Sequence, residues 1–302
     1  MLCSCGRPHI TLLAERIDAD QKAIDDLSAQ AHGPTAELTK AKVRELKAEV
    51  KAEAEMLKGL KRARAEMLKT LKAALDLTDA QTLLTLPRDK LLDFVLRAGM
   101  GLAVDDFIGQ QALIAETALS SMVDVLEGVK VDNQIQGQID ALAVSASATV
   151  FDDVILPDTL KSVREALEAM VVGVPTAQAM TALAQRLEKA EGRQLTEVRT
   201  KLSQYGRNVT AVVAEATGLD LYLYTGPRDG ITRAFCRALI DKVVDEKQMR
   251  RLSNGQGLPV KTSGGGYNCR HSWSPITEGF MIAAKLNKAT ASDIAKANAG
   301  AR

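Results

Sequence analysis

The sequence predicts a mainly α-helical protein with a small α+β module at its C-terminal end. Hydrophobic residues make up 46% of the 302 residues, but aromatic residues only 3%, with abundant Ala and Leu. This composition favours packed helices over a β-sandwich. Residues 35–76 contain no Pro and a single Gly, which is typical of one long helix, whereas residues 219–224 alternate with a period of two. We therefore expect a long helical hairpin or coiled coil and a helical bundle, followed by the α+β module.

The first two helices are predicted to pair. Residues 10–31 form an uneven apolar stripe that ends at Gly33-Pro34, where Pro cannot continue a helix. Residues 35–76 follow a heptad frame in which eight of ten core positions are apolar. These positions are Val43, Leu46, Val50, Glu53, Leu57, Leu60, Arg64, Met67, Leu71 and Ala74. So long a stripe needs a partner, in the same chain or in a neighbouring copy, and the 10–31 helix is the first candidate.

The middle of the chain also has a helical pattern throughout. Thr78-Asp79-Ala80-Gln81 is a capping box, and Pro residues stand where further helices begin. The expected helices start at Thr78 and Pro87 and then cover 103–127, 157–172, 175–190 and 192–217; residues 129–156 are helix-compatible but less clearly patterned. Gly218 is expected to cap the last of these helices.

After Gly218 the pattern becomes mixed. The expected elements are strands at 219–224, 241–244 and 272–276, helices at 232–239, 246–252 and 279–299, and a long Gly-rich loop at 253–267. We divide the chain into residues 1–77 (N-terminal tip and long helical hairpin), 78–190 (helical domain) and 191–302 (α+β module with a C-terminal helix).

Charge is spread unevenly although the net charge is only +1. Residues 40–72 carry eleven Lys or Arg against five Asp or Glu, residues 76–153 carry four against thirteen, and residues 218–302 carry thirteen against seven. This pattern indicates solvated helix faces, self-neutralising packing or a charged partner. No apolar run is long enough to span a bilayer and the N-terminus lacks a signal-peptide core, so we expect synthesis in a reducing cytoplasm and no membrane partner.

Rare residues gather between Tyr224 and Pro275. This stretch holds the only Trp, two of the four Cys and one of the three His. Its ordered motif consists of Asp229, Thr232, Arg233, Cys236, Asn268, Cys269, Arg270 and Pro275. In order and spacing the motif resembles the C-terminal module of the phage Mu F-like minor head proteins, the phage head morphogenesis family of tailed bacteriophages. The resemblance covers about residues 205–278. Where that family often has Pro-Pro-x-His, this chain has Gly264-Gly-Gly-Tyr267, and its His follows the Cys.

The resemblance implies a structural, non-enzymatic virion protein made in the host cytoplasm. Such a protein would reach the procapsid through the portal and act in head morphogenesis, DNA packaging or DNA ejection. Its expected partners are portal and capsid proteins, other copies through the long helices, and packaged DNA without sequence specificity. Two alternatives are open: a neck or adaptor protein below the portal, and, in another class, a Cys–His hydrolase or toxin-like transferase.

Cys236, Cys269 and His271 are candidate metal ligands. Cys269 and His271 would lie on one face of an extended segment, and zinc prefers tetrahedral Cys and His ligation. A fourth ligand would have to come from Asp229 or from an N-terminal Cys. Two other interpretations are open: a Cys236–Cys269 disulfide, and two buried thiols that pack a small core beside a hydrogen-bonded His271. Apart from zinc, we expect no cofactor.

The other motif residues are interpreted as structural. Asp229 either pairs with Arg233 or caps the following helix, Asn268 and Arg270 flank Cys269, and Trp273 belongs to the core. Gly264–Gly266 lacks the ending of a phosphate-binding loop and is expected to allow close backbone approach.

At the other end of the chain, Cys3, Cys5 and His9 form a second possible metal cluster.

Overall fold

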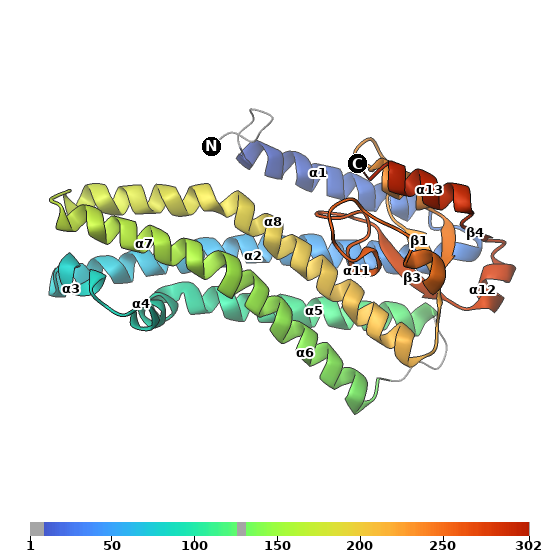
Figure 1. Ribbon diagram of the computed structural model, residues 1–302, viewed down its shortest axis with the longest axis horizontal. Helices are drawn as coiled ribbons and strands as arrows, with labels where there is room; N and C mark the ends of the chain where they lie inside the picture. Colours follow the sequence, from blue (N-terminus) through green and yellow to red (C-terminus); the bar gives the residue numbers. More distant parts are fainter. Residues whose placement is uncertain (1–8, 126–130, 302) are drawn as a thin grey trace. The chain divides into compact units, whose positions relative to one another are not determined.

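Figure 1 shows the chain as a computed structural model that describes residues 9–125 and 131–301, with only the backbone for residues 9–17, 124 and 125. The predicted fold class is confirmed, because long helices dominate and one small sheet lies near the C-terminus. The helices are α1 (His9–Ala29), α2 (Ala36–Leu77), α3 (Ala80–Leu84), α4 (Arg88–Val95), α5 (Gly101–Val125), α6 (Asn133–Val150), α7 (Leu156–Val171), α8 (Thr176–Ala216), α9 (Ala234–Leu239), α10 (Glu246–Met249), α11 (Val260–Ser263), α12 (Glu278–Ala283) and α13 (Ala291–Ala299). The strands are β1 (Leu221–Thr225), β2 (Lys242–Asp245), β3 (Ser272–Ile276) and β4 (Asn287–Lys288).

The chain forms two compact units built from interleaved segments. Among the described residues, the helical unit comprises residues 9–13, 52–110 and 145–198, and the sheet unit comprises residues 14–51, 111–125, 131–144 and 199–301. The boundaries between these segments fall inside α1, α2, α5, α6 and α8. The division into 1–77, 78–190 and 191–302 follows chain order and stays a prediction.

The helical unit is a bundle with an apolar core. Figure 1 shows α7 and the first part of α8 as an antiparallel pair, which Glu165 and Arg186 bridge at 3.4 Å. Phe107 of α5 meets Phe151, in the π-helical segment Phe151–Ile155, in a near-perpendicular contact with 5.6 Å between ring centroids. Fully buried core residues include Leu60, Met67, Leu91, Val95, Val163, Leu167 and Leu183.

The α2 stripe is covered within the chain. In the helical unit, Leu60, Met67 and Leu71 are buried, and the polar heptad residue Arg64 is buried too, paired with Glu191 of α8 at 2.9 Å and donating to Gln194. Burial lowers the pKa of Arg64, and the Glu191 carboxylate opposes that shift. Self-association through the long helices stays a prediction, and it would have to use other faces of α2.

In the sheet unit, α1 folds back on α2 as the sequence predicts. Residues Gly33–Thr35 form a short 3-10 turn between the two helices. Ile24 and Leu27 of α1 then pack against Val43 and Leu46 of α2 in one buried cluster. The heptad pattern therefore identified the correct partner for this end of α2.

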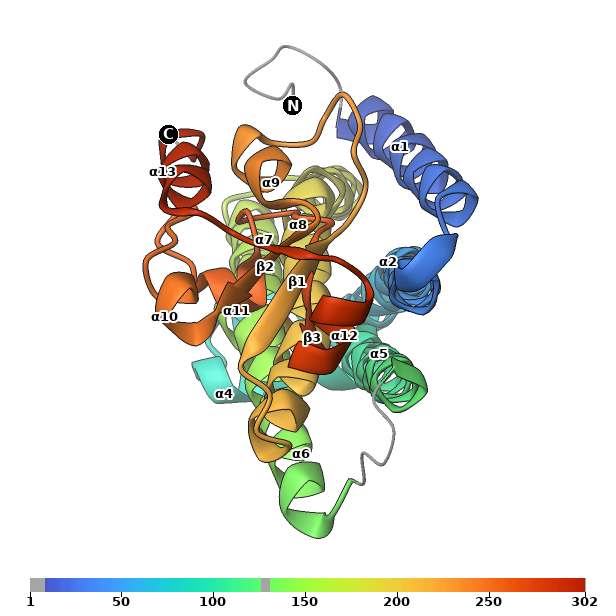
Figure 2. The same ribbon diagram turned by 90° about the vertical axis from the view of Figure 1, so that its right-hand side faces the viewer.

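The sheet has the strand order β3-β1-β2-β4. β1 is antiparallel to both of its neighbours, β3 and β2, which lie on either side of it in Figure 2, and β4 is parallel to β2. Alternate residues of β1 point to opposite faces. Leu221 and Leu223 join Leu38, Val243 and Ile276 in one apolar cluster. Tyr222 and Tyr224 are buried on the opposite face, and Tyr224 stands opposite Trp273 of β3. Because both faces are covered, four of the five β1 residues are buried.

Several expectations about helix boundaries were wrong. The N-cap of α3 is Asp79, which accepts from the Thr82 N–H, and not Thr78 of the expected capping box. Pro157 does not start a helix, because the chain is helical without a break from Asn133 to Val171. Residues 175–190 and 192–217 form the single helix α8, which runs through Gly192 because the buried contacts around Glu191 and Gln194 outweigh the roughly 1 kcal/mol that one Gly costs a helix. The 253–267 loop contains the short helix α11. Residues 279–299 divide into α12, β4 and α13, because Thr290 and Asp293 form a capping box that starts a new helix.

None of the described helices combines the length and the apolarity needed to cross a membrane.

Candidate metal centre of the sheet unit

The three predicted metal ligands meet in the sheet unit, where they form what we call the Cys–His cluster. Cys236 comes from α9, Cys269 from the loop after α11, and His271 from the residue before β3. The two Sγ atoms lie 3.7 Å apart, Cys269 Sγ lies 3.8 Å from His271 Nδ1, and all three candidate ligand atoms fall within 4.8 Å of one another. All three residues are buried, and both cysteines are free thiols.

The His271 ring is held in one orientation. Its Nε2 lies 2.8 Å from the carbonyl oxygen of Pro227, which can only accept a hydrogen bond. We therefore assign the ring proton to Nε2, which leaves the Nδ1 lone pair directed at the cysteines. The ring also stacks on Tyr224, with 5.4 Å between centroids and 16° between planes. The backbone at Gly226 can lie directly against the His271 ring because glycine has no Cβ, which would overlap the ring.

The Gly-rich run brings the backbone against the sulfur atoms. The Gly265 N–H donates to Cys269 Sγ at 3.1 Å. A Cβ on Gly265 would lie 2.5 Å from Cys236 Sγ, and one on Gly264 would lie 3.0 Å from Cys269 Sγ. The interpretation of this run as a site of close backbone approach therefore agrees with the structure.

The pKa values of the two thiols are shifted in opposite directions. The pKa of Cys269 is held well below its usual value chiefly because Cys236 donates a hydrogen bond to it, and the nearby Arg207 adds to this effect against the opposing cost of burial. The pKa of Cys236 is raised by that same hydrogen bond and by burial. Tyr224 Oη lies 3.4 Å from Cys236 Sγ and 3.6 Å from Cys269 Sγ, and burial raises the pKa of Tyr224 well above its usual value.

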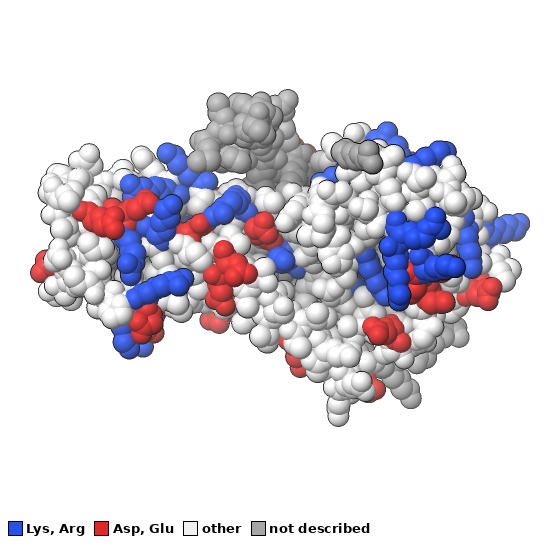
Figure 3. Space-filling model, in the orientation of Figure 1, with Lys and Arg blue, Asp and Glu red and all other residues white. Residues whose placement is uncertain are grey.

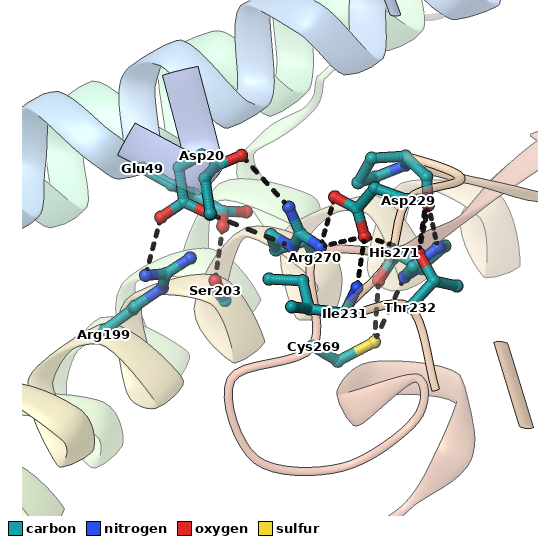
Figure 4. A network of polar contacts seen from close by, with 12 residues as sticks. Asp20, Glu49, Arg199, Ser203, Asp229, Ile231, Thr232, Cys269, Arg270 and His271 are labelled. Atoms are coloured by element: carbon teal, nitrogen blue, oxygen red, sulfur yellow. Dashed lines mark hydrogen bonds and ion pairs between the residues drawn. The ribbon is translucent and has the colours of Figure 1, made fainter. Parts of the chain in front are cut away.

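An ion-pair network lies beside the cluster and consists of Asp20, Arg199, Asp229 and Arg270 (Figure 4). Arg270 contacts Asp229 at 2.7 Å and lies 3.9 Å from Asp20, which Arg199 contacts at 2.8 Å. Arg270 also donates to the carbonyl of Ala19 at 3.4 Å.

Sequence reasoning missed Asp20 and Arg199, although each carries a recognisable signal. Asp20 lies between Ile17 and Ile24 on the apolar stripe of α1, and Arg199 lies between Leu195 and Leu202 on that of α8. A charged residue on an apolar stripe is buried with its helix, so it needs a partner. What the stripe does not show is which partner it has.

Asp229 and Arg233 do not pair with each other, and Asp229 does not cap α9, so both expectations were wrong. Asp229 Oδ1 accepts from the Ile231 N–H at 3.1 Å and from Thr232 Oγ1 at 2.9 Å, which closes a local turn. The other carboxylate oxygen of Asp229 pairs with Arg270. Arg233 is the N-cap residue of α9 without a side-chain cap, and it donates to the carbonyls of Gly265 and Tyr267 at 2.8 and 2.6 Å. Arg233 thus links α9 to the Gly-rich loop.

The remaining motif residues are Trp273 and Asn268. Trp273 is buried, donates from Nε1 to the Val260 carbonyl at 3.0 Å, and packs on Tyr224 with 4.2 Å between ring centroids. It is therefore a core residue, as expected. Asn268 adopts a φ of 58° directly before Cys269, a left-handed conformation that Asn tolerates better than most residues.

A cavity of about 230 Å³ opens beside the Cys–His cluster. It is lined by both cysteines and His271, and by the charged side chains of Asp20, Arg199, Arg233 and Arg270. Arg270 pairs with Asp229 and Arg199 with Asp20, so the excess positive charge at this cavity comes from Arg233, which donates to two backbone carbonyls. The predicted N-terminal cluster cannot be compared, because Cys3 and Cys5 lie outside the described residues and only the backbone of His9 is described.

Asp229 should make the sheet unit sensitive to acid. Burial opposes its ionisation, but hydrogen bonds from Arg270 and Thr232 outweigh that effect and hold the pKa of Asp229 below its usual value. The resulting stabilisation is present above the unfolded pKa of about 3.9 and is lost as the pH falls through the lower folded value. Urea unfolding at several pH values should show a smaller acid-dependent loss of stability for Asp229→Asn than for the wild type. Asp241→Asn, at an exposed carboxylate, is the matched control and should follow the wild-type curve. Equal slopes for the wild type and Asp229→Asn would contradict this role.

Gly265→Ala should destabilise the sheet unit by about 1–3 kcal/mol, because the new Cβ would overpack the buried cluster. Gly230→Ala is the matched control, since a Cβ there meets nothing within 4 Å and the backbone already has an ordinary φ. Chemical denaturation followed by circular dichroism measures both variants. The close-approach argument fails if Gly265→Ala is as stable as Gly230→Ala.

Comparison with protein-family models, with curated proteins and with solved structures matches no family, protein or structure to this chain.

Proposed function

We propose that this chain is a structural minor head protein of a tailed bacteriophage, similar to the phage Mu F-like family, which associates with the portal or procapsid. The observation that carries the proposal is the convergence of the family-like motif. The motif has two parts that are separated by more than 30 positions in the sequence, yet they line one cavity or contact each other directly. The first part is Asp229, Thr232, Arg233 and Cys236, and the second is Asn268, Cys269 and Arg270. A chance likeness in residue order would not require such contacts.

The contacts themselves support a structural role for the motif. Arg233 holds the Gly-rich loop, Thr232 Oγ1 donates to the Pro227 carbonyl at 2.9 Å, and Asp229 is paired with Arg270. Their charged groups are satisfied inside the sheet unit. The motif therefore serves to lock two loops around β1 and β3, which would give a virion protein a rigid docking module.

The charge distribution supports contact with packaged DNA. Residues 218–302 carry thirteen Lys or Arg against seven Asp or Glu. Figure 3 shows Lys and Arg side chains gathered over the C-terminal part of the visible face. Residues Lys247, Arg250 and Arg251, in and after α10, are exposed. Contacts of this kind bind phosphates without reading sequence, so we expect DNA affinity to fall steeply as salt rises.

The test is a reconstruction of the intact virion around the portal vertex without imposed capsid symmetry. Density for this chain inside the head or on the portal would support a minor head protein made in the host cytoplasm and carried in the virion. A closed ring below the portal, with matching copy number, would favour the alternative of a neck or adaptor protein. Absence of the chain from both purified procapsids and virions would overturn the proposal.

One observation favours a candidate of another class. Cys269 and His271 meet at 3.8 Å beside a cavity, and a thiolate next to an imidazole can act as a nucleophile. A Cys–His hydrolase or toxin-like transferase would lose its activity in Cys269→Ser. A structural protein would have no activity to lose, while its incorporation into particles could still be followed by mass spectrometry of the virion.

A further inference from the structure

We propose that Cys236 Sγ, Cys269 Sγ and His271 Nδ1 bind one zinc ion, with the fourth coordination position facing the cavity and occupied by water. The inference rests on the geometry of the sheet unit and is independent of the virion proposal. A zinc ion bound there would cross-link α9 to the loop that leads into β3.

The distances already approach those of a zinc site. Two thiolates bound to one tetrahedral zinc at about 2.3 Å each lie about 3.8 Å apart, and a thiolate and an imidazole nitrogen lie about 3.6 Å apart. The Sγ–Sγ distance here is 3.7 Å and the distance from Cys269 Sγ to His271 Nδ1 is 3.8 Å. The third pair, Cys236 Sγ and His271 Nδ1, lies within 4.8 Å, so this pair would have to approach by up to about 1.2 Å to share a tetrahedral zinc ion.

The surroundings of His271 match those of a metal-bound imidazole. Ligating histidines donate their second ring N–H to a carboxylate or backbone carbonyl, which fixes the tautomer and the ring orientation. Here Nε2 is 2.8 Å from the Pro227 carbonyl, and Tyr224 stacks on the ring.

The surroundings of the two sulfur atoms suit thiolates. Gly265 donates its N–H to Cys269 Sγ, and Tyr224 Oη lies 3.4 and 3.6 Å from the two Sγ atoms. Arg207 donates to the Cys269 carbonyl oxygen, which brings its positive charge close. Zinc would displace the thiol protons to solvent, and two thiolates with one neutral imidazole would leave the centre uncharged. Soft sulfur ligands in tetrahedral geometry favour zinc over magnesium, calcium or manganese.

The fourth position is left to a small ligand. Asp229, the side chain considered from the sequence, is engaged by Arg270, Thr232 and the Ile231 N–H and is not part of the cluster. The 230 Å³ cavity instead borders all three protein ligands and carries Arg233 and Arg270 on its wall. Three protein ligands with an open position are the pattern of sites that exchange a water or bind an anion.

The first measurement is the metal content of the full-length protein, expressed with zinc and purified under reducing conditions. We expect one zinc per chain in the wild type and in Cys3→Ser/Cys5→Ser, and a loss of at least about tenfold in zinc affinity in Cys236→Ser, Cys269→Ser and His271→Asn. Wild-type protein without zinc, zinc retained by all three cluster variants, or zinc lost only from Cys3→Ser/Cys5→Ser would each overturn the proposal.

Cobalt substitution keeps the test decisive if the cluster variants do not fold. Co²⁺ added to metal-free wild-type protein should give thiolate-to-metal charge transfer and the intense visible bands of tetrahedral coordination. X-ray absorption of the zinc form should show two sulfur atoms at about 2.3 Å and nitrogen or oxygen at about 2.0 Å. Absence of the charge-transfer band, or a disulfide between Cys236 and Cys269 in the reduced preparation, would overturn the site. Azide should shift the cobalt bands, whereas an unchanged spectrum would refute the open fourth position.

Discussion

Replacing Arg270 with Met should lower the free energy of unfolding of the sheet unit by about 3–5 kcal/mol, because it removes one partner from a buried ion pair. The Arg270 side chain is only 7% exposed, and its partners Asp20 and Asp229 are 5% and 16% exposed. Without Arg270, Asp20 keeps Arg199, but Asp229 keeps only Thr232 and a backbone N–H. The uncompensated Asp229 charge is the main source of the expected loss.

The matched control is Arg228→Met in the same unit. Arg228 pairs with Asp241 at 3.3 Å, but the two side chains are 53% and 74% exposed, and exposed pairs contribute only about 0–1 kcal/mol. Equilibrium unfolding in urea, followed by Trp273 fluorescence, reports on this unit directly. If both Arg variants lose the same small amount of stability, the ion-pair network does not hold the unit together.

Replacing Tyr224 with Ala should cost about 3–5 kcal/mol, the range for removing a large aromatic side chain from a core. Tyr224 is completely buried and contacts three rings. The centroid distances are 4.2 Å to Trp273, 5.4 Å to His271 and 6.4 Å to Phe235. These contacts link β1 to β3 and to α9, so the loss should also loosen the Cys–His cluster.

A second variant measures the contribution of the Tyr224 hydroxyl apart from that of the ring, and a third is an exposed control. Tyr224→Phe keeps the three ring contacts but removes the oxygen beside the sulfur atoms, for an expected cost of about 1 kcal/mol. Tyr267→Ala, at a side chain that is 40% exposed, should change stability by no more than about 0.5 kcal/mol. A Tyr224→Ala variant as stable as Tyr267→Ala would show that these ring contacts do not stabilise the fold.

Much of the fold could be predicted because its signals are local. The heptad pattern predicted α2, the Gly33-Pro34 break predicted the return of α1, and period-two alternation predicted β1. Each of these signals depends on residues within a few turns or a few positions of one another. The continuity of α8 through Gly192 was missed because a weak local preference was outweighed by contacts with α2, far away in the sequence.

The candidate site, like the fold, was only partly predictable from the sequence. The clustering of Cys236, Cys269, His271 and Trp273 in one motif was visible because these residue types are rare in this chain. The choice of partners was not visible, since Asp229 could reach Arg233 four positions away yet pairs with Arg270, and Arg270 also reaches Asp20 in α1. The partner of a charged side chain depends on distance in the folded structure and not on separation in the sequence.

By itself, the sequence determined the long helices and the strands β1, β2 and β3, which faces of the long helices are apolar, and which rare side chains could carry chemistry. Only the tertiary structure decided that the charges Asp20 and Arg199 pair with each other, that the two thiols and the imidazole converge, and that a cavity opens beside them. The physical reason is that periodicity and capping are properties of short segments. The partner of a buried charge or of a metal ligand is set by the packing of segments that are separate in the sequence, by about 30 residues for the two cysteines and by more than 170 for Asp20 and Arg199. The loss of hydration must then be offset by whichever partner the fold brings into reach.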